Sequence, residues 1–167
     1  MIDTEIVFET HPEVDIQELV AFYRRQHHPA AGADKLRRMA DQTFCFVTAR
    51  RRDGELIGIA RGVTDGLVGY LAECKLDPAC QGPACVTRTK GRIEHDEAGI
   101  AREMARRVVD ELMRSGVDRI HVLAYGTEVD FCEEMGFRRV TGMVPLELCA
   151  ADRRGGMAPV VGKQAPA

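Results

Sequence analysis

Three cysteines and a histidine stand within one short stretch of the chain, and side chains of these kinds can hold a metal ion. They are Cys74, Cys80, Cys85 and His95. Zinc prefers thiolate and imidazole ligands, and its sites usually pair them with about two to four residues between partners. The gaps between these cysteines are five and four residues, and the sequence has no Cys-x-x-Cys. The spacing disfavours a metal site, and a redox-responsive segment is an alternative of equal weight.

The charge balance of the chain limits its partners. Of the 167 residues, 23 are basic and 26 acidic, and the two kinds are well mixed, for a formal net charge of −3. Such a chain has no global field to attract nucleic acid or an anionic membrane. The arginine run 50–52 has no aromatic residue interleaved with it and is interpreted as a solvated hairpin tip. A small molecule is therefore the expected partner, with no nucleic acid and no membrane.

The N-terminal sequence and the cysteines favour a cytoplasmic location. Residues 1–10 carry three acidic side chains and no basic cluster ahead of an apolar run, which is not typical of a signal peptide. No stretch approaches the length needed to span a bilayer. In the cytoplasm the six cysteines are expected to be thiols or ligands and not a disulfide framework.

The elements that must position any site follow from the hydrophobic periodicity. The first half of the chain predicts a strand, two helices and a three-stranded antiparallel meander with tight polar turns. These elements cover 5–9, 15–26, 34–40, 44–48, 56–63 and 68–76. The second half predicts a long amphipathic helix, a buried strand, a short helix and one or two last strands. They cover 101–113, 119–124, 129–134 and 137–148.

This order of elements predicts an α/β fold. A helix followed at once by a buried strand implies a crossover to a parallel neighbour, whereas the meander is antiparallel. We therefore expect a single mixed, mostly antiparallel sheet flanked by helices on both faces. One domain would cover 1–150, and residues 151–167, rich in Gly, Pro and Ala, would form a flexible tail.

Three local patterns within this order resemble the GNAT acetyltransferase family over roughly 6–148. They are Gly54-Glu55-Leu56-Ile57-Gly58-Ile59-Ala60, Glu73-Cys74-Lys75-Leu76-Asp77-Pro78 and Phe131-Cys132-Glu133-Glu134-Met135-Gly136-Phe137. The last is the most specific, since it is similar to the family's "FYexlGF". The resemblance implies an acyl-CoA N-acyltransferase-like fold and transfer of an acetyl or other acyl group from acyl-coenzyme A to an amine. Acetyl-CoA would be the co-substrate, and a homodimer is compatible with the resemblance.

The resemblance also implies where the coenzyme binds. In this family the fourth and fifth strands part, and the coenzyme lies between them and against the turn before the long helix. The matching positions are Cys74, Lys75, Leu76, Glu97, Ala98, Gly99, Ile100, Ala101 and Arg102, with Leu123 and Ala124 on the far strand. Small residues in the turn let backbone N–H groups approach a pyrophosphate at the positive end of the helix.

Catalytic roles follow from the same resemblance. Glu73 stands where a partly buried carboxylate would take the proton of the amine. Cys132 occupies the position of the family's tyrosine that protonates the leaving thiolate, and Tyr125 is the alternative donor.

Two departures from the family pattern keep other functions open. Asp96 stands where the family has Gln or Arg, and 79–95 is an insertion that could fold over the site and supply positive charge. One alternative is a GNAT-fold binding or regulatory module without turnover. The other is a metal- or redox-responsive protein that uses the segment from Cys74 to Cys85.

Overall fold

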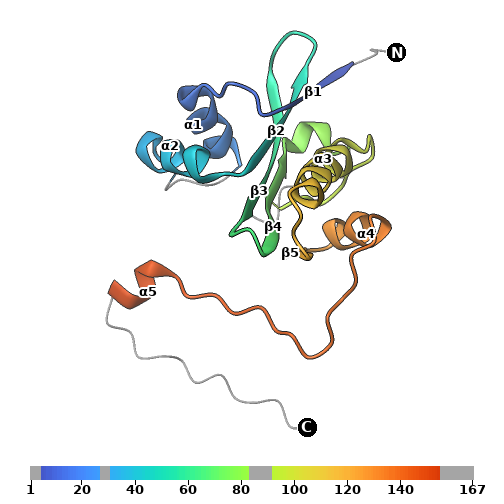
Figure 1. The fold of residues 1–167 in the computed structure, drawn as a ribbon. Coiled ribbons are helices and arrows are strands. Elements are labelled where there is room, and N and C mark those ends of the chain that lie inside the picture. The colour runs from blue at the N-terminus through green and yellow to red at the C-terminus, as the bar shows by residue number, and fades with distance from the viewer. Residues whose placement is uncertain (1–4, 27–30, 83–91, 155–167) are drawn as a thin grey trace.

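Five strands form one open sheet in the order β1-β2-β3-β4-β5 in the computed structural model of the chain, which describes residues 5–26, 31–82 and 92–154. The strands are β1 (Ile6–Thr10), β2 (Cys45–Arg51), β3 (Leu56–Thr64), β4 (Val68–Leu76) and β5 (Arg119–Val122). The helices are α1 (Ile16–Arg25), α2 (Ala33–Gln42), the short 3-10 helix η1 (Pro78–Cys80), α3 (Ile100–Arg114), α4 (Thr127–Glu134) and α5 (Ala150–Arg154). Figure 1 shows how they are arranged.

The strand directions are those that the order of elements predicts. β1 to β4 pair antiparallel with their neighbours, and β5 pairs parallel with β4. The long helix α3 is the crossover between β4 and β5, and it lies against the sheet (Figure 1). The expected mixed, mostly antiparallel sheet is confirmed.

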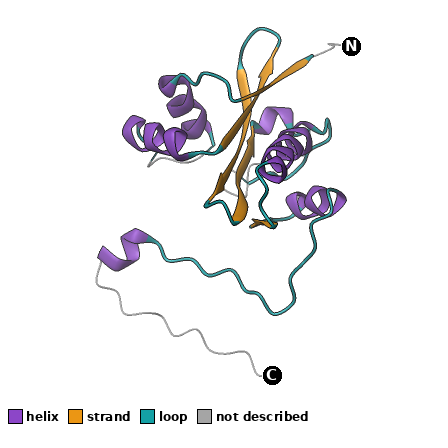
Figure 2. Cartoon of the chain, viewed as in Figure 1, coloured by secondary structure: helices purple, strands orange, loops and turns teal. Residues whose placement is uncertain are grey.

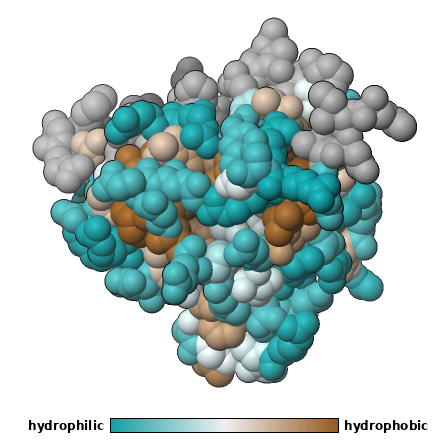
Figure 3. Space-filling view, turned by 90° about the horizontal axis from the view of Figure 1, so that it is seen from above, coloured by the Kyte–Doolittle hydropathy of each residue, from teal (hydrophilic) through white to brown (hydrophobic). Residues whose placement is uncertain are grey.

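Helices cover both faces of the sheet (Figure 2). α1 and α2 lie on one face, and α3 lies on the other with α4 beside it. Each face therefore has its own hydrophobic core, one under α1 and α2 and a larger one under α3 and α4. Viewed from above, apolar side chains reach the surface in separate places between hydrophilic ones (Figure 3). No helix in the described residues is long and apolar enough to cross a membrane.

Close packing of α3 onto β3 depends on glycine. A Cβ at Gly62 would lie 2.8 Å from Cγ1 of Val108, and a Cβ at Gly58 would lie 2.7 Å from Cε of Met104. Real Cβ atoms do not approach other atoms this closely, so a Cβ at Gly62 would require a shift of the helix, whereas a Cβ at Gly58 would displace the flexible end of Met104. The helix is thereby held at a fixed height over the sheet.

A buried glutamine organises the chain between β4 and α3. The side chain of Gln81 donates to the carbonyl oxygen of Leu76 at 2.8 Å and accepts from the N–H groups of Glu94 and His95 at 2.9 and 3.2 Å. Its backbone carbonyl also accepts from the N–H of Glu97. The two ends of the predicted insertion are thus tied to the sheet at one point, while its residues 83–91 lie outside the described residues.

The prediction of one or two last strands within 137–148 is wrong. Residues 138–149 form neither helix nor strand, and every one of them is exposed. Figure 1 shows this segment leaving α4 and running beneath the domain to the short helix α5. Its sequence has strand-like alternation, but a strand forms only where another strand accepts its backbone hydrogen bonds.

Candidate active site

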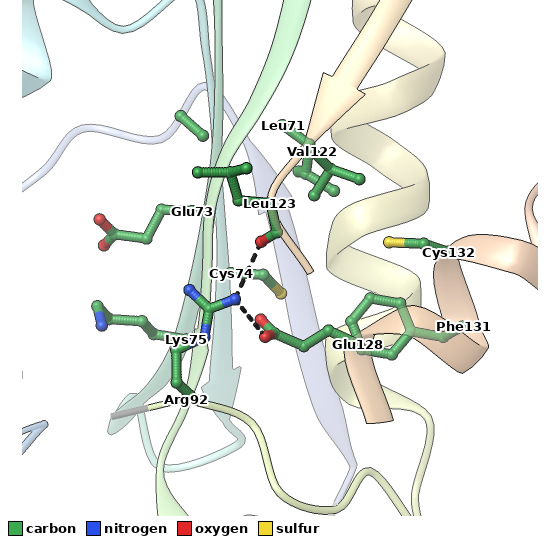
Figure 4. A pocket seen from close by; sticks show the side chains of 11 residues that line it. Leu71, Glu73, Cys74, Lys75, Arg92, Val122, Leu123, Glu128, Phe131 and Cys132 are labelled. Carbon is green, nitrogen blue, oxygen red and sulfur yellow. Dashed lines mark hydrogen bonds and ion pairs between the residues drawn. The ribbon is translucent and has the colours of Figure 1, made fainter. Parts of the chain in front are cut away.

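Pairing between β4 and β5 stops halfway along β4. The parallel register runs from Val68 with Arg119 to Leu71 with Val122, whereas β3 stays paired with β4 as far as Leu76. Beyond that point β4 and β5 part and leave a pocket of about 160 Å³. It is lined by Leu71, Ala72, Glu73, Cys74, Lys75, Arg92, Val122, Leu123, Glu128, Phe131 and Cys132 (Figure 4).

An ion pair crosses the space between the parted strands. Nη2 of Arg92 lies 2.6 Å from Oε1 of Glu128 and donates to the carbonyl oxygen of Leu123 at 2.9 Å (Figure 4). The side chain of Glu128 is 8% exposed and that of Arg92 is 41% exposed. Burial raises the pKa of Glu128, and the positive charge of Arg92 acts against that rise. Arg92 therefore stabilises the carboxylate and also satisfies a backbone carbonyl that β4 does not.

A bulge decides which way Glu73 points. Opposite β3 the register passes from Arg61 with Glu73 to Gly62 with Leu71, so Ala72 is an extra residue of β4. Simple alternation along β4 would place Leu71 and Glu73 on the same face. Because of the bulge, Leu71 instead joins the core under α3 while Glu73 faces the helix α1.

Two side chains hold the carboxylate of Glu73. The hydroxyl of Tyr23, from α1, donates to Oε1, and Nη2 of Arg61, from β3, lies 3.3 Å from Oε2. Burial, followed by the negative charge of Glu73, raises the pKa of Tyr23 well above its ordinary value. Tyr23 is therefore a neutral donor, and Glu73 is oriented and partly neutralised where α1 meets the pocket.

Cys74 and Lys75 alternate from this point along β4. Lys75 shares the face of Glu73 and is buried, and burial lowers its pKa. Cys74 points to the opposite side, toward α3, where its thiol donates to the carbonyl oxygen of Ala101 at 3.6 Å. Burial raises the pKa of the Cys74 thiol, so it is held as a neutral group. Figure 4 shows the two side chains pointing away from each other.

The two candidate proton donors have different surroundings. Cys132, on α4, is buried in the pocket wall, and burial raises the pKa of its thiol to about 11. The side chain of Tyr125 is exposed and does not line the pocket, although its backbone N–H donates to Oε1 of Glu128. Of the two, Cys132 lines the pocket and Tyr125 does not.

The turn before α3 is already occupied by a carboxylate. Gly99 has a φ of 70°, in the left-handed region that glycine adopts most readily, and α3 begins at the next residue. Asp96 caps the helix, with Oδ1 and Oδ2 each 3.0 Å from the backbone nitrogens of Ala101 and Arg102 respectively. These N–H groups are the ones expected to receive a pyrophosphate. The positive end of α3 does bind an anion, and that anion is the chain's own.

The metal candidates are not brought together. Cys80 accepts a hydrogen bond from Nη2 of Arg51 at 3.1 Å, Cys74 faces α3, and Cys85 lies outside the described residues. Among the described residues no group of three metal-ligating side chains lies close enough to hold an ion. The backbone N–H of His95 donates to the side chain of Gln81, and this bond fixes the position of His95.

Sequence reasoning missed several residues of the pocket and its rim. Tyr23, Arg61 and Glu128 were not singled out, and Arg92 was considered only as one of the basic residues of the 79–95 insertion. The i, i+2 spacing of Glu73 and Lys75 on one strand is a local pattern, and it predicts that the two charged side chains share a face. The partners of Glu73 and Glu128 come from distant segments, so no local pattern could identify them.

Comparisons with known proteins place the fold. No family model and no curated protein matches the sequence. Among solved structures, the chain is similar to a Deinococcus radiodurans R1 protein assigned as an acetyltransferase, at 24% identity and a TM-score of 0.60 over 92% of this chain and 94% of that chain. It is also similar to a GNAT-family acetyltransferase from Streptococcus pneumoniae TIGR4, at 15% identity and a TM-score of 0.59 over 86% and 98% of the two chains.

A third structure of the same fold includes the coenzyme. It is a protein from Clostridium acetobutylicum, predicted to be an acetyltransferase and solved with acetyl-CoA. The identity is 15% and the TM-score 0.57, over 86% of this chain and 96% of that chain. At these identities the likeness shows the fold, and the GNAT fold that the sequence motifs predict is confirmed.

Proposed function

We propose that the protein is an N-acyltransferase that moves an acetyl group from acetyl-CoA to an amine. The parting of β4 and β5 carries this proposal, because on the side away from β3 it leaves backbone groups between Ala72 and Leu76 without a neighbouring strand among the described residues. A chain of amides such as the pantetheine arm can pair with such an edge as an added strand does. The proposed place of action is the cytoplasm, where the described cysteines would stay the free thiols that they are.

Entry of the coenzyme requires two exchanges of partner. The acyl end would displace the guanidinium of Arg92 from the carbonyl oxygen of Leu123. The pyrophosphate would displace the carboxylate of Asp96 from the N–H groups of Ala101 and Arg102. Both displaced side chains belong to the segment between β4 and α3, so one movement of that segment would open both places. Arg92 would then be free to meet phosphate charge.

The chemistry requires a base on one side of the thioester and an acid on the other. The amine nitrogen bonds to the thioester carbonyl carbon, and the carbon–sulfur bond breaks with its electron pair going to sulfur. Glu73 would take one proton from the amine, which enters from the α1 face where Tyr23 and Arg61 orient the carboxylate. A backbone N–H of the parted strand would stabilise the oxyanion.

The leaving thiolate needs a proton. Cys132 is the proposed donor because it lines the pocket and its thiol is protonated at neutral pH. Tyr125 is the alternative if the residues before α4 turn inward when coenzyme binds.

A second candidate function is a binding module of the same fold without turnover. The occupied helix end and the ion pair of Arg92 with Glu128 favour it, because both fill positions that the coenzyme would need. The metal- or redox-responsive alternative has no comparable support, since the described cysteines do not converge.

Calorimetric titration with acetyl-CoA tests the proposal. Asp96→Asn keeps the shape of the cap but removes its charge, so it should bind acetyl-CoA at least about tenfold more tightly than the wild type. Asp34→Asn, on the exposed first turn of α2, is the matched control and should leave the affinity unchanged. If neither the wild type nor Asp96→Asn binds millimolar coenzyme, the acyltransferase proposal fails.

Turnover with a panel of amines separates the two candidate functions. Glu73→Gln should slow turnover about 100-fold without changing the affinity for acetyl-CoA, because it removes the base and keeps the hydrogen-bonding shape. Binding without turnover of any amine by the wild type would instead identify a binding module.

A further inference from the structure

Lys75 is a buried cation that lines the pocket and has no partner. It is 6% exposed, and its ammonium group makes neither a hydrogen bond nor an ion pair with any described residue. The two internal segments outside the described residues, 27–30 and 83–91, contain no acidic side chain that could pair with it. An unpaired charge is costly to bury, so buried cations are normally paired. The described chain therefore supplies the cation but no matching anion.

The charges around Lys75 are already balanced in two ion pairs. Arg61 lies 3.3 Å from the carboxylate of Glu73, and Arg92 lies 2.6 Å from that of Glu128. Burial lowers the pKa of Lys75, and the negative charge of Glu73 offsets this only in part. The ammonium group is therefore the one charge in excess among these five side chains, and an anion from outside the chain would balance it.

Two further hydrogen-bond donors on this side of the sheet lack an acceptor. Nε of Arg61 and Nε2 of Gln26 are buried and make no hydrogen bond. Arg61 reaches the carboxylate of Glu73, and Gln26 stands three residues after Tyr23, on the side of α1 that meets β4. Buried donors nearly always have a partner. A carboxylate or phosphate only accepts hydrogen bonds, so it is the kind of group that suits a place lined with unused donors.

The position of Lys75 favours an anion of the acceptor over a phosphate of the coenzyme. Lys75 and Glu73 extend the same way from β4, on the face toward α1 (Figure 4). The first turn of α3, where the pyrophosphate is proposed to bind, lies on the opposite face, to which Cys74 points. Two residues of a strand span about 7 Å, so a group at Lys75 would lie a few bonds from an amine at Glu73.

We propose that Lys75 binds an acidic group of the acceptor, so that the substrate is a small amine that also carries a carboxylate or a phosphate. This role rests on the proposed acyl transfer, because it requires the amine to approach Glu73. The acid pairs with the ammonium group, and the amine is thereby positioned beside the base. An uncharged amine of the same shape leaves the buried ammonium unpaired and is therefore a poorer substrate.

Pairs of amines that differ in charge test the site. The probes are glycine and β-alanine, each paired with its amide, and phosphoethanolamine paired with ethanolamine. With saturating acetyl-CoA, the wild type should show a kcat/KM at least about tenfold higher for the acid of at least one pair. Lys75→Met keeps the buried stem without the charge and should lower that acid-to-neutral ratio at least about tenfold. Lys35→Met, exposed on α2, is the matched control and should keep the wild-type ratio. Comparing the same pair on each protein cancels the intrinsic difference in reactivity between its two amines.

Calorimetric titration with the same pairs separates the acid site from the acyl-transfer proposal. If no amine is turned over but the wild type binds an acid at least about tenfold more tightly than its neutral partner, and Lys75→Met does not, the acid site stands and acyl transfer fails. Equal turnover of acids and neutral partners by the wild type overturns the acid site and leaves acyl transfer intact, whether or not Lys75→Met folds. A folded Lys75→Met protein with the wild-type ratio overturns the acid site as well. Neither binding nor turnover of any probe overturns it too.

Discussion

The two edges of β4 differ in how far they are paired with neighbouring strands. Toward β3, β4 is paired from Gly69 to Leu76, interrupted only by the bulge at Ala72. Toward β5, pairing ends at Leu71, and side chains from other segments fill the space. A buried backbone group left without a partner costs free energy, and across the gap Arg92 satisfies the carbonyl oxygen of Leu123 in place of β4. The edge toward β3 stabilises the sheet. The edge toward β5 contributes less stability and leaves a place where a ligand can bind.

The largest expected effect is at the paired edge. Gly62→Ala puts a Cβ against Cγ1 of Val108, whose β-branched side chain cannot rotate away in a helix. We expect the free energy of unfolding to fall by about 2 to 3 kcal/mol in chemical denaturation.

The matched change lies on the parted edge. Ala72 is exposed in the bulge, so Ala72→Val should change the free energy of unfolding by less than about 0.5 kcal/mol. Equal losses for the two variants would contradict the account of close packing between β3 and α3.

The second prediction concerns the ion pair in the gap. Arg92→Ala leaves the buried carboxylate of Glu128 without its cation, and we expect a loss of about 2 kcal/mol at pH 7. This is below the usual cost of breaking a buried pair because Arg92 is partly solvated. The double variant Arg92→Ala with Glu128→Gln should recover at least half of the loss.

The pH dependence of that loss has a definite sign. The folded-state pKa of Glu128 is raised above its ordinary value of 4.5, so the folded protein binds this proton more readily than the unfolded chain. Its contribution to stability is greatest at low pH and is lost as the pH rises through the folded pKa. Relative to the wild type, Arg92→Ala should therefore be less destabilised at pH 5 than at pH 7. A pH-independent difference between the two proteins would contradict this account.

The smallest effect is a difference in thiol reactivity that leaves the fold unchanged. With a pKa of about 11, only about a thousandth of Cys132 is thiolate at pH 8, and the residue is 3% exposed. Iodoacetamide should modify the exposed Cys149 at least about 100-fold faster, as measured by peptide mass spectrometry. Comparable rates at the two cysteines would show that the parted edge opens readily without ligand.

Local patterns predicted those parts of the fold that local interactions determine. The apolar stripe of α3 and the polar turns of the meander each lie within about twenty residues, and both are present as expected. Residues 138–149 show the limit of such patterns. Alternation gives Val144 and Leu146 the preference for a strand, but the partner edge decides whether one forms.

The candidate site was less predictable because its geometry depends on pairs that are distant in sequence. The face of Glu73 is set by a bulge opposite Arg61, and its hydroxyl partner Tyr23 stands 50 residues away. The residue type of Asp96 did not reveal that it caps α3. As a departure from a motif it suggested a lost site, whereas the structure shows a carboxylate resting on the helix end that the motif describes.

Gln81 has a consequence for how the chain can change in length. It ties the carbonyl of Leu76 to the N–H groups of Glu94 and His95, so the chain between these points leaves and returns at one fixed place. Loop-closure entropy grows slowly, by about 0.6 kcal/mol for each doubling of loop length. The loop-closure cost of adding or removing residues between Gly82 and Arg92 is therefore small.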